Sequence, residues 1–481
     1  MLQAGKDYIS EVRAKVLEPV DVVIAGGGTA GVVAALAAAR MGVKTMLIEA
    51  KGFAGGMLTG GNAGVTMFTK FSGRPEEHAA DLKCLAECPE KLHVAKGIPM
   101  EIADRLLRSG SALGNSGTVG AYLFTSSEDF KRVLVEMLEE AGVKVRFHTL
   151  AVDVIRNGKT IEGVALESKS GREIIPARQF IDATGDGDLA VRAGADYTVG
   201  VTQDDISARP ETVGSMAGMG VMFKVGNVDF DKVFAWLGEH PKRYQCQPFA
   251  RFSYEEALER YRRGEMSTFN VDRPESFPKH FQVYVLPTRG AATLCCPTVG
   301  GLDGCNADDL SHAERTIAKL LGRWMTGLRE VPGFEQAFLL QVPEMGVRET
   351  RHIQCDYILN LMDIYEQKQF EDCIGFGSHP VDTHPRPEWL KDPGTSYPPR
   401  WYFQIPFRSL IVKKLDNLLV AGRCIGATHE GFGCIRPTVQ CMVIGEAAGT
   451  AAAMAVQENV PLRELSMAAL RSRLKANGAL C

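Results

Sequence analysis

A glycine-rich turn close to the N-terminus constrains the fold most strongly. The segment from Val20 to Ile24 is apolar except for Asp21, as in a strand buried on both faces, and the turn GGGTAG follows it. Gly26, Gly28 and Gly31 form the pattern GxGxxG, in which the first glycine allows a tight turn, the second admits a pyrophosphate and the third lets the next helix pack closely. The stretch therefore predicts a strand, a turn and a helix whose N-terminus faces a dinucleotide.

An acidic residue at the expected distance supports this interpretation. An Ala-rich helix ends near Gly42, a second apolar segment runs from Lys44 to Ile48, and Glu49 follows it. A carboxylate placed about 20 residues beyond the glycines binds ribose hydroxyls and disfavours a 2′-phosphate. Two alternatives remain: the uncharged run from Val22 to Ala39 is long enough for a membrane helix, and GxGxxG also occurs by chance. Asp21 and three consecutive glycines argue against the membrane helix.

Composition and charge narrow the class of protein. The chain has 481 residues, enough for two or three units with substantial cores. Lys+Arg 54 against Asp+Glu 58 give a net charge of -4 without a charge block, so we expect neither nucleic acid nor a membrane as a partner. The N-terminus lacks the apolar core of a secretory signal, which predicts a cytoplasmic protein whose 12 cysteines are thiols. A homo-oligomer stays open.

Two further glycine-containing strands predict that the nucleotide unit is discontinuous in sequence. IDATGDGD follows a predicted hairpin, and LLVAGR precedes an Ala-rich helix near the C-terminus. The region between them is richer in aromatic residues, prolines and histidines. We therefore predict an α/β fold, with a Rossmann-like nucleotide unit built on a mostly parallel sheet, and an α+β substrate domain. The expected boundaries are an extension at 1–18, the nucleotide unit at 19–200 and 401–465 with a helical excursion at 75–120, the substrate unit at 201–400 and a C-terminal segment at 466–481.

With these motifs in order, the chain resembles the FAD-dependent oxidoreductases of the glutathione-reductase structural class. More narrowly, VGVRETRHI, SHPVDTH, IPFRSLIVKKLDNLLVAGRCIGATHEGFG and RPTVQCMVIGEAAGTAAA resemble a bacterial group of FAD-dependent oxidoreductases that is distantly related to the fumarate reductase and succinate dehydrogenase flavoproteins. The resemblance runs from about Val20 to Val456. It implies FAD as the cofactor, and the absence of an HPTG-like segment favours noncovalent attachment.

The resemblance also implies which residues hold FAD. The early glycines and Met57 would meet the pyrophosphate, Glu49 the ribose, Val152 the adenine, and Arg423 the pyrophosphate or ribityl chain. The helix beginning near Pro437 would aim its N–H groups at the flavin. Arg423 and Glu446 depart from the group, which often has aspartate and glutamine there. The implied set is Gly26, Gly28, Thr29, Ala30, Gly31, Glu49, Ala50, Lys51, Gly55, Gly56, Met57, Val152, Ala183, Thr184, Gly185, Gly422, Arg423, Pro437 and Thr438.

Candidates for proton transfer lie on a proline-rich segment. His379, Asp382 and His384 fall within six residues, on a predicted loop. One histidine, with His384 favoured, would accept or donate the proton while Asp382 orients it. A metal site and solvated surface histidines are the alternatives, and we expect no metal. His429 and Glu430 form a second acid/base candidate.

Two arginines provide a candidate anion clamp. Arg348 and Arg351 are three residues apart and could share one helix face, where they would hold a carboxylate. The alternative is that they pair with Glu344 or Glu349.

Other residues beside the late FAD strand complete the set of candidates. Tyr402 and Arg408 flank IPF before that strand, so we expect them near the edge of the flavin. Cys424 and Cys434 have no dithiol spacing and are expected to pack in the core.

The expected activity is hydride transfer between a small, carboxylate-bearing substrate and flavin N5. The direction of the reaction and the second electron donor or acceptor are left open by the sequence. Two alternatives remain: a flavin monooxygenase using NAD(P)H and oxygen, and a non-redox FAD-binding protein. The absence of a second GxGxxG weighs mildly against the monooxygenase. The absence of a basic charge balance weighs mildly against the non-redox protein, for which RNA would be a partner.

Overall fold

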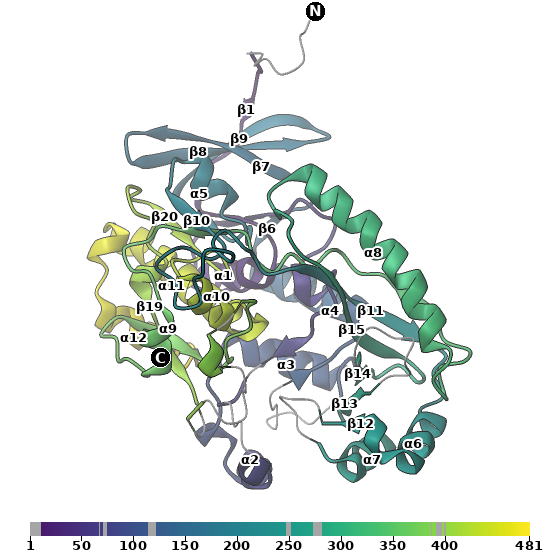
Figure 1. The fold of residues 1–481 in the computed structure, drawn as a ribbon. Helices are drawn as coiled ribbons and strands as arrows, with labels where there is room; N and C mark the ends of the chain where they lie inside the picture. The colour runs from purple at the N-terminus through teal and green to yellow at the C-terminus, as the bar shows by residue number, and fades with distance from the viewer. Residues whose placement is uncertain are drawn as a thin grey trace, which may run out of the picture.

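The protein consists of two units that lie side by side, each with its own hydrophobic core (Figure 1). The computed structural model describes residues 11–66, 68–70, 75–113, 122–246, 252–272, 281–385, 387–390, 397–398 and 401–481. The expected N-terminal extension lies partly outside the described residues. Inside them, β1 (Lys15–Val16) pairs with the central sheet.

A parallel sheet forms the centre of the first unit. β2 (Val20–Ala25) lies between β3 (Thr45–Ile48) and β9 (Gly171–Asp182). β6 (Lys144–Arg146) extends the sheet beyond β3, and β20 (Leu418–Val420) pairs with β9, all in parallel. The apolar side chains from Val22 to Ala25 in β2 are fully buried, as expected for a central parallel strand. The predicted α/β fold with a mostly parallel sheet is confirmed.

The long strand β9 joins this sheet to an antiparallel hairpin. Its second half pairs with β2 and β20, whereas its first half pairs with β8 (Thr160–Ser168), which in turn pairs with β7 (Leu150–Asn157). The hairpin turns at Gly158, where the backbone has a positive φ of 59°. This is the hairpin that the alternation of side chains predicts.

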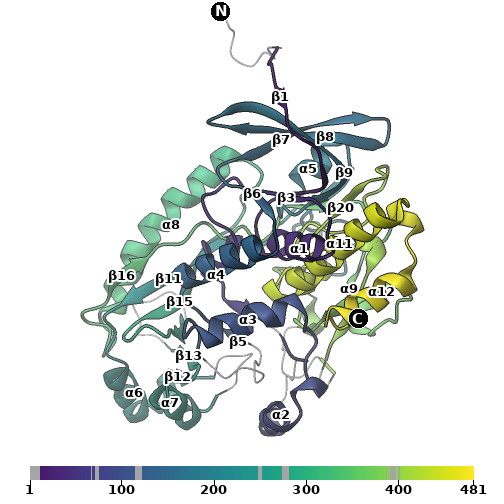
Figure 2. The ribbon, with the colours of Figure 1, turned by 180° about the vertical axis from the view of Figure 1, so that it is seen from behind.

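Two Ala-rich helices from opposite ends of the chain pack against each other. α1 (Thr29–Arg40) and α11 (Thr438–Glu458) run side by side in Figure 2. Cβ atoms at Gly445 and Gly449 would lie only 2.2 and 2.1 Å from backbone oxygens of α1. The helices can approach this closely because glycine stands at both contact positions.

The same contact explains the apolar composition of α11. Among the described residues, α11 is the one helix that is long and apolar enough to cross a membrane, and its most apolar 18-residue window is entirely buried. It packs between α1 and β18 (Cys373–Gly377), so its apolar surface is part of the core. The alternative of a membrane helix over Val22 to Ala39 is wrong, because β2, the glycine turn and α1 divide that run.

In its described part, residues 75–113, the predicted helical excursion contains two α-helices. These are α2 (Pro75–Glu87) and α3 (Ile98–Arg108). The helix α4 (Ser127–Glu140) follows and contacts both α1 and α3. Figure 2 shows α1, α3 and α4 together on one side of the first unit.

The second unit is a six-stranded antiparallel sheet covered by helices. The long helix α8 (Ala307–Leu328) packs against β15 (Ala292–Val299) and β11 (Met219–Gly226). The shorter helices α6 (Phe230–Glu239) and α7 (Tyr254–Arg262) lie at the far end of the sheet in Figure 1. The strand order is β12 (Tyr244–Gln245), β13 (Thr268–Val271), β14 (Phe281–Val285), β15 (Ala292–Val299), β11 (Met219–Gly226) and β16 (Phe338–Gln341).

The boundary between the two cores differs from the expected one. The sequence predicts a substrate unit over 201–400, but the second core draws on residues 219–345 and Phe124. Buried residues of β17 (Arg351–Ile353), α9 (Leu361–Tyr365) and β18 pack in the first core. The sequence-based boundary lies where the aromatic and proline content changes. The core that a strand joins depends instead on its pairing partner, and β17 pairs with β10 (Tyr197–Val199).

Adding a methyl group at the helix contact should destabilise the fold. The Cβ of Gly449→Ala would overlap the Ala34 carbonyl, so we expect the free energy of unfolding to fall by about 1–3 kcal/mol. Gly322, which is exposed in α8 and where an added Cβ would meet nothing within 4 Å, is the matched control, and Gly322→Ala should raise that free energy by up to about 1 kcal/mol. Urea titration of both variants measures the difference, and effects of the same sign would contradict the close-contact account.

Candidate active site

The glycine turn is closed around Gly26 and Gly31 but open at Gly28. Gly26 has a φ of +96°, and a Cβ there would lie 2.5 Å from the carbonyl oxygen of Ala183. A Cβ on Gly31 would lie 1.8 Å from the oxygen of Gly26, whereas one on Gly28 would meet nothing within 4 Å. The turn thus leaves space beside backbone N–H groups at the start of α1, which fits a pyrophosphate.

Glu49 is held beside this turn by two backbone donors. Its Oε2 accepts a hydrogen bond from the Gly27 N–H at 2.7 Å, and its Oε1 accepts one from the Lys51 N–H at 2.7 Å. The side chain is 8% exposed, and burial raises the pKa of Glu49 although both backbone bonds favour the charged form. The carboxyl group therefore sits at the end of β3 next to the open turn, in the position predicted for ribose binding.

Segments far apart in the sequence meet at this edge of the sheet. The N–H of Gly55 donates to the Gly27 oxygen at 2.8 Å, and a Cβ on Gly56 would lie 3.0 Å from Gly28. The N–H of Ala183 donates to the Ala25 oxygen at 2.8 Å. Gly422, after β20, has a φ of +94° and would bring a Cβ within 3.2 Å of the Ala30 side chain. The structure thus brings together the predicted early, middle and late cofactor segments.

The N-terminus of α11 carries buried polar groups. Pro437 is its N-cap residue, and the Thr438 hydroxyl donates to the Gly64 oxygen at 3.2 Å. In the first turn, the amide of Gln440 is fully buried, and neither its Nε2 nor its Oε1 has a hydrogen-bond partner in the described part of the chain. Nε of Arg436, which stands just before the helix, is also buried and has no hydrogen-bond partner among the described residues. Buried groups of this kind fit a hydrogen-bonding ring edge at the positive end of the helix.

Comparison with known proteins identifies the class that this fold and site define. Residues 21–474 match the family described as FAD dependent oxidoreductase, and the chain belongs to that family. FAD is therefore the cofactor that the glycine turn, Glu49 and the α11 N-terminus fit. Its noncovalent attachment, the oligomeric state, the electron partner and the cytoplasmic location stay predictions. A search of curated proteins finds no match.

Solved structures with a similar arrangement include several distant ones. A geranylgeranyl bacteriochlorophyll reductase-like protein from Thermoplasma acidophilum is 13% identical, with 96% of this chain and 84% of that chain covered and a TM-score of 0.42. A p-nitrophenol 4-monooxygenase from Pseudomonas putida is 14% identical, with 95% and 83% covered and a TM-score of 0.44. A myxobacterial chondrochloren halogenase is 12% identical, with 96% and 78% covered and a TM-score of 0.44.

Arg423 binds side chains from two different segments of the chain. Its Nη2 donates to Oδ1 of Asp186 at 2.6 Å, and its Nη1 donates to the Thr350 hydroxyl at 2.8 Å. A Cβ on Gly185 would lie 3.2 Å from its Nε. The guanidinium thus links the ATGDGD loop to the segment before β17, and contact with FAD stays a prediction.

Glu446 lies at the start of α3 rather than at the glycine turn. Its Oε1 accepts a hydrogen bond from the Ile98 N–H at 3.3 Å, and a Cβ on Gly97 would lie 2.6 Å from the same oxygen. Burial raises the pKa of Glu446 to about 8. The departure from glutamine at this position therefore affects the packing of α3 on α11.

The segment with His379, Asp382 and His384 is a loop, as predicted. His379 is buried, its Nδ1 donates to the Pro380 oxygen at 2.7 Å, and burial lowers the pKa of His379 to about 4. His384 is exposed. The backbone oxygen of Asp382 accepts a hydrogen bond from Arg436 at 2.8 Å, and its carboxylate pairs with the same guanidinium. Although burial raises it, the pKa of Asp382 is held below its ordinary value by the charge of Arg436.

The predicted helix face shared by Arg348 and Arg351 is wrong. Residues 342–350 form no helix, and Arg351 begins strand β17. Arg351 donates to Oδ1 of Asp188 at 2.7 Å, while Nη1 of Arg348 donates to the Gly218 oxygen. Residues three apart in an extended segment point to different neighbours, so the two arginines belong to different surroundings.

Glu349, between these arginines, is the centre of a buried network. It accepts hydrogen bonds from His352 Nε2 at 2.9 Å, His429 Nδ1 at 2.7 Å and the Ala217 N–H at 2.6 Å. Burial opposes it, but the two histidines hold the pKa of Glu349 at about 2. Burial lowers the pKa of His429, but the hydrogen bond and the charge of Glu349 outweigh burial, so the pKa of His429 is raised. Its Nε2 donates to the Pro385 oxygen at 3.3 Å. The sequence predicts Glu349 only as a partner of the arginines, and His352 was missed, although the run RETRH places acid and histidine three residues apart.

Glu430 continues this network toward the second unit. Its Oε1 accepts hydrogen bonds from the N–H and the hydroxyl of Ser207 at 2.7 and 2.6 Å. Asp205 accepts from the His429 N–H at 3.1 Å, and burial together with Asp205 raises the pKa of Glu430. The predicted acid/base pair His429 and Glu430 thus joins α10 (His429–Ile435) to the loop around residue 205. A catalytic role for either residue stays a prediction.

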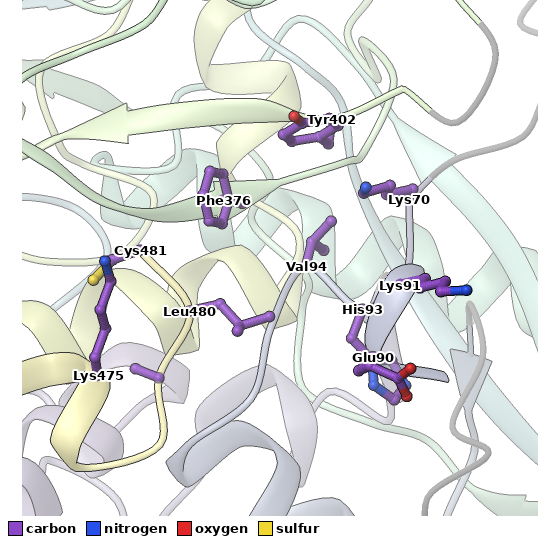
Figure 3. A pocket seen from close by; sticks show the side chains of 11 residues that line it. Lys70, Glu90, Lys91, His93, Val94, Phe376, Tyr402, Lys475, Leu480 and Cys481 are labelled. Carbon is purple, nitrogen blue, oxygen red and sulfur yellow. The ribbon is translucent and has the colours of Figure 1, made fainter. Parts of the chain in front are cut away.

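Tyr402 lies in a pocket of about 370 Å³ on the surface of the hairpin formed by β18 and β19 (Phe403–Pro406). Figure 3 shows its ring near Lys70, whose Nζ is 4.7 Å from the ring centroid, and near Phe376. None of the other predicted catalytic residues lines this pocket. Arg408 instead pairs with Asp372 at 3.0 Å, so IPF separates two different environments.

The two candidate cysteines lie in the core. Cys424 and Cys434 are fully buried, and burial raises the pKa of both thiols well above the ordinary value. Within the described ranges, no three His, Cys, Asp or Glu side chains are arranged to hold a metal ion.

Removing the carboxylate of Glu49 should weaken FAD binding. We expect Glu49→Ala to raise the dissociation constant by about 10- to 100-fold, because one charge-assisted hydrogen bond contributes roughly 1.5–3 kcal/mol. Asp21→Ala is the matched control, since Asp21 accepts from the Lys44 N–H at the opposite end of β2. Fluorescence titration of the apoprotein with FAD measures both constants, and equal affinities would refute the ribose role.

The buried carboxyl of Glu446 should make stability depend on pH. Its pKa is raised from 4.5 to about 8, so between these values the folded protein keeps a proton that the unfolded chain has lost. The free energy of unfolding therefore falls as pH rises through this window. Glu446→Gln should remove the decline, worth about 1.4 kcal/mol per pKa unit, whereas Glu458→Gln at the exposed end of α11 should not. The free energy of unfolding of both variants is measured at pH 5 and pH 8. An equal change with pH in Glu446→Gln and Glu458→Gln would contradict this account.

Proposed function

We propose that this protein transfers a hydride between a small, carboxylate-bearing organic substrate and FAD. The observation that carries the proposal is the position of Arg436, which stands directly before the α11 N-cap and holds Asp382 of the histidine loop. This contact connects the predicted proton-transfer residues with the helix end that fits the flavin.

The cations beside this helix end support an anionic substrate. Nε of Arg436 is buried without a partner among the described residues, and its side chain is only 14% exposed. Burial raises the pKa of Asp382, whereas the charges of Arg436, His379 and Arg348 lower it, so Arg348 lies in the same neighbourhood. Arg348 and Arg436, from different parts of the chain, thus replace the pair that the sequence suggested. Guanidinium groups bind carboxylates strongly because they present parallel N–H donors.

Each of these groups is assigned one role in the proposed reaction. FAD, when bound, supplies the hydride chemistry. Arg348 and Arg436 would hold the substrate carboxylate, and the positive end of α11 adds to the local field. His384 is assigned the proton because its exposed ring can exchange with solvent. His379 is the alternative: its low pKa keeps it neutral near pH 7, with Nδ1 donating and Nε2 able to accept.

The proposal is tested by an anaerobic screen of carboxylic acids, monitoring loss of the oxidised flavin spectrum. For an acid that reduces the flavin, Arg436→Gln should raise KM by about 10- to 100-fold, as expected for one lost charge-assisted contact. Arg351→Gln, which removes the pair with Asp188, is the matched control and should leave KM unchanged. A larger KM effect at Arg351 would refute the clamp.

Two other outcomes would overturn the proposed reaction. Flavin that is reduced only by NAD(P)H, with oxygen then inserted into a substrate, would define a monooxygenase. FAD that binds tightly but is reduced by no acid and by no nicotinamide would define a non-redox role.

A further inference from the structure

One face of the six-stranded sheet is polar although it is buried. Pairing registers align Lys224 of β11 with Thr293 of β15, Thr293 with Tyr284 of β14, and Tyr284 with Thr268 of β13. Residues that pair in this way point to the same face of a sheet. The four side chains therefore form a row across four strands, and each is at most 5% exposed.

The opposite face shows that this polarity is a property of one side only. The neighbouring positions Phe223, Leu294, Val283 and Phe269 are apolar and fully buried. The ring of Phe223 meets Trp324 of α8 edge-on at 5.9 Å, so this face packs on the helix. The row that includes Lys224 accordingly faces away from α8.

Several groups on the polar face have no hydrogen-bond partner in the described part of the chain. These are the hydroxyls of Thr268 and Thr293 and, two residues along β13, the Oδ1 of Asn270. An unsatisfied buried polar group costs about 1–3 kcal/mol, so three of them on one face need an explanation. A ligand that supplies both donors and acceptors would satisfy them.

Two contacts place this face opposite the flavin end of the cofactor site. Asn62, in the loop after the glycine run, donates to the Met222 oxygen of β11 at 3.2 Å. The ring of Phe124 stacks on Tyr284 at 4.0 Å, and a Cβ on Gly64 would lie 3.0 Å from the same ring. Gly64 also accepts the hydrogen bond from the α11 N-terminus, so the loop at 62–64 lies between that helix end and the sheet.

We propose that this polar face, defined by Lys224, Thr293, Tyr284, Thr268 and Asn270, is the wall on which the substrate lies, and that the substrate is a hydroxyl-rich carboxylic acid of the sugar-acid type. The inference rests on the proposed function and adds the substrate class. An apolar or aromatic acid would leave the threonine hydroxyls and the asparagine oxygen unsatisfied, whereas substrate hydroxyls both donate and accept.

Lys224 adds a positive charge to this wall. Among the described residues, no carboxylate accepts a hydrogen bond from its amine. Its Nζ donates to the Ser127 hydroxyl at 2.8 Å. Burial lowers the pKa of Lys224 to about 8, against a smaller opposing effect of Glu128. An acceptor oxygen of the substrate beside Nζ would favour the charged amine. Arg348 lies at the other end of β11, next to Gly220. The substrate would therefore lie along the strand between two cations.

Matched pairs of acids test the substrate class by calorimetry on the FAD-loaded protein. D-gluconate is compared with hexanoate, and shikimate with cyclohex-1-ene-1-carboxylate, since each pair shares a carbon skeleton and differs only in its hydroxyls. We expect the hydroxylated acid of at least one pair to bind at least 10-fold more tightly than its partner. Equal or tighter binding of both apolar acids, or binding of neither hydroxylated acid, would overturn the assignment.

Isosteric variants separate a binding role from a structural one. Thr293→Val and Thr268→Val should weaken binding of the hydroxylated acid at least 5-fold while leaving the melting temperature of the ligand-free protein unchanged or higher, because an unbonded hydroxyl is removed. Thr326→Val, on the exposed face of α8, is the control and should not alter binding. A lower melting temperature with unchanged affinity would show that the hydroxyls are structural and would refute the wall.

The same measurements distinguish failure of this inference from failure of the proposed function. A hydroxylated acid that binds and depends on Thr293, but never reduces the flavin, would leave the wall in place and refute hydride transfer. Flavin reduction by an acid without hydroxyls, unaffected by Thr293→Val, would support hydride transfer and refute the wall.

Discussion

The close contact between α1 and α11 is the constraint on which the cofactor site depends. Glycines at 445 and 449 let α11 touch the backbone of α1, which brings the two ends of the chain together. The N-terminus of α1 then faces the open glycine turn, and the N-terminus of α11 stands beside the loop at 62–64. Both positive helix ends are thus placed where they fit one cofactor, although about 400 residues separate them in sequence.

The motifs between these helices mainly join structural segments. Glu349 collects His352 and His429, and Arg423 ties Asp186 to Thr350. These contacts satisfy buried charges that would otherwise be costly, and they fix the loops that surround the flavin. They also explain why several residues with the chemistry of catalysis lie in buried networks, while Arg436 stands directly before the N-cap of α11.

The two units contribute different chemistry to the site. The first supplies the phosphate-binding turn, the ribose carboxylate and the helix ends that fit the cofactor of the FAD-dependent family. The second presents a sheet with one apolar face on α8 and one buried polar face toward the flavin loop. On this proposal, substrate recognition is concentrated on strands whose individual sequences look ordinary, because a row across four strands is not contiguous in the chain.

The sequence by itself determined the cofactor half of the protein. GxGxxG, Glu49, ATGDGD and the late glycine are local patterns, since each needs only a few neighbouring residues to create its turn or its acid, and they predicted FAD and the segments that the fold brings together at one edge of the sheet. Whether Arg348 and Arg351 act together, where Tyr402 points, which core takes β17, α9 and β18 and which strands align Lys224 with Thr268 were decided only by tertiary structure. The physical reason is that these relations depend on strand pairing and on the packing of one core against another, which bring distant residues together without leaving a periodic signal in the chain.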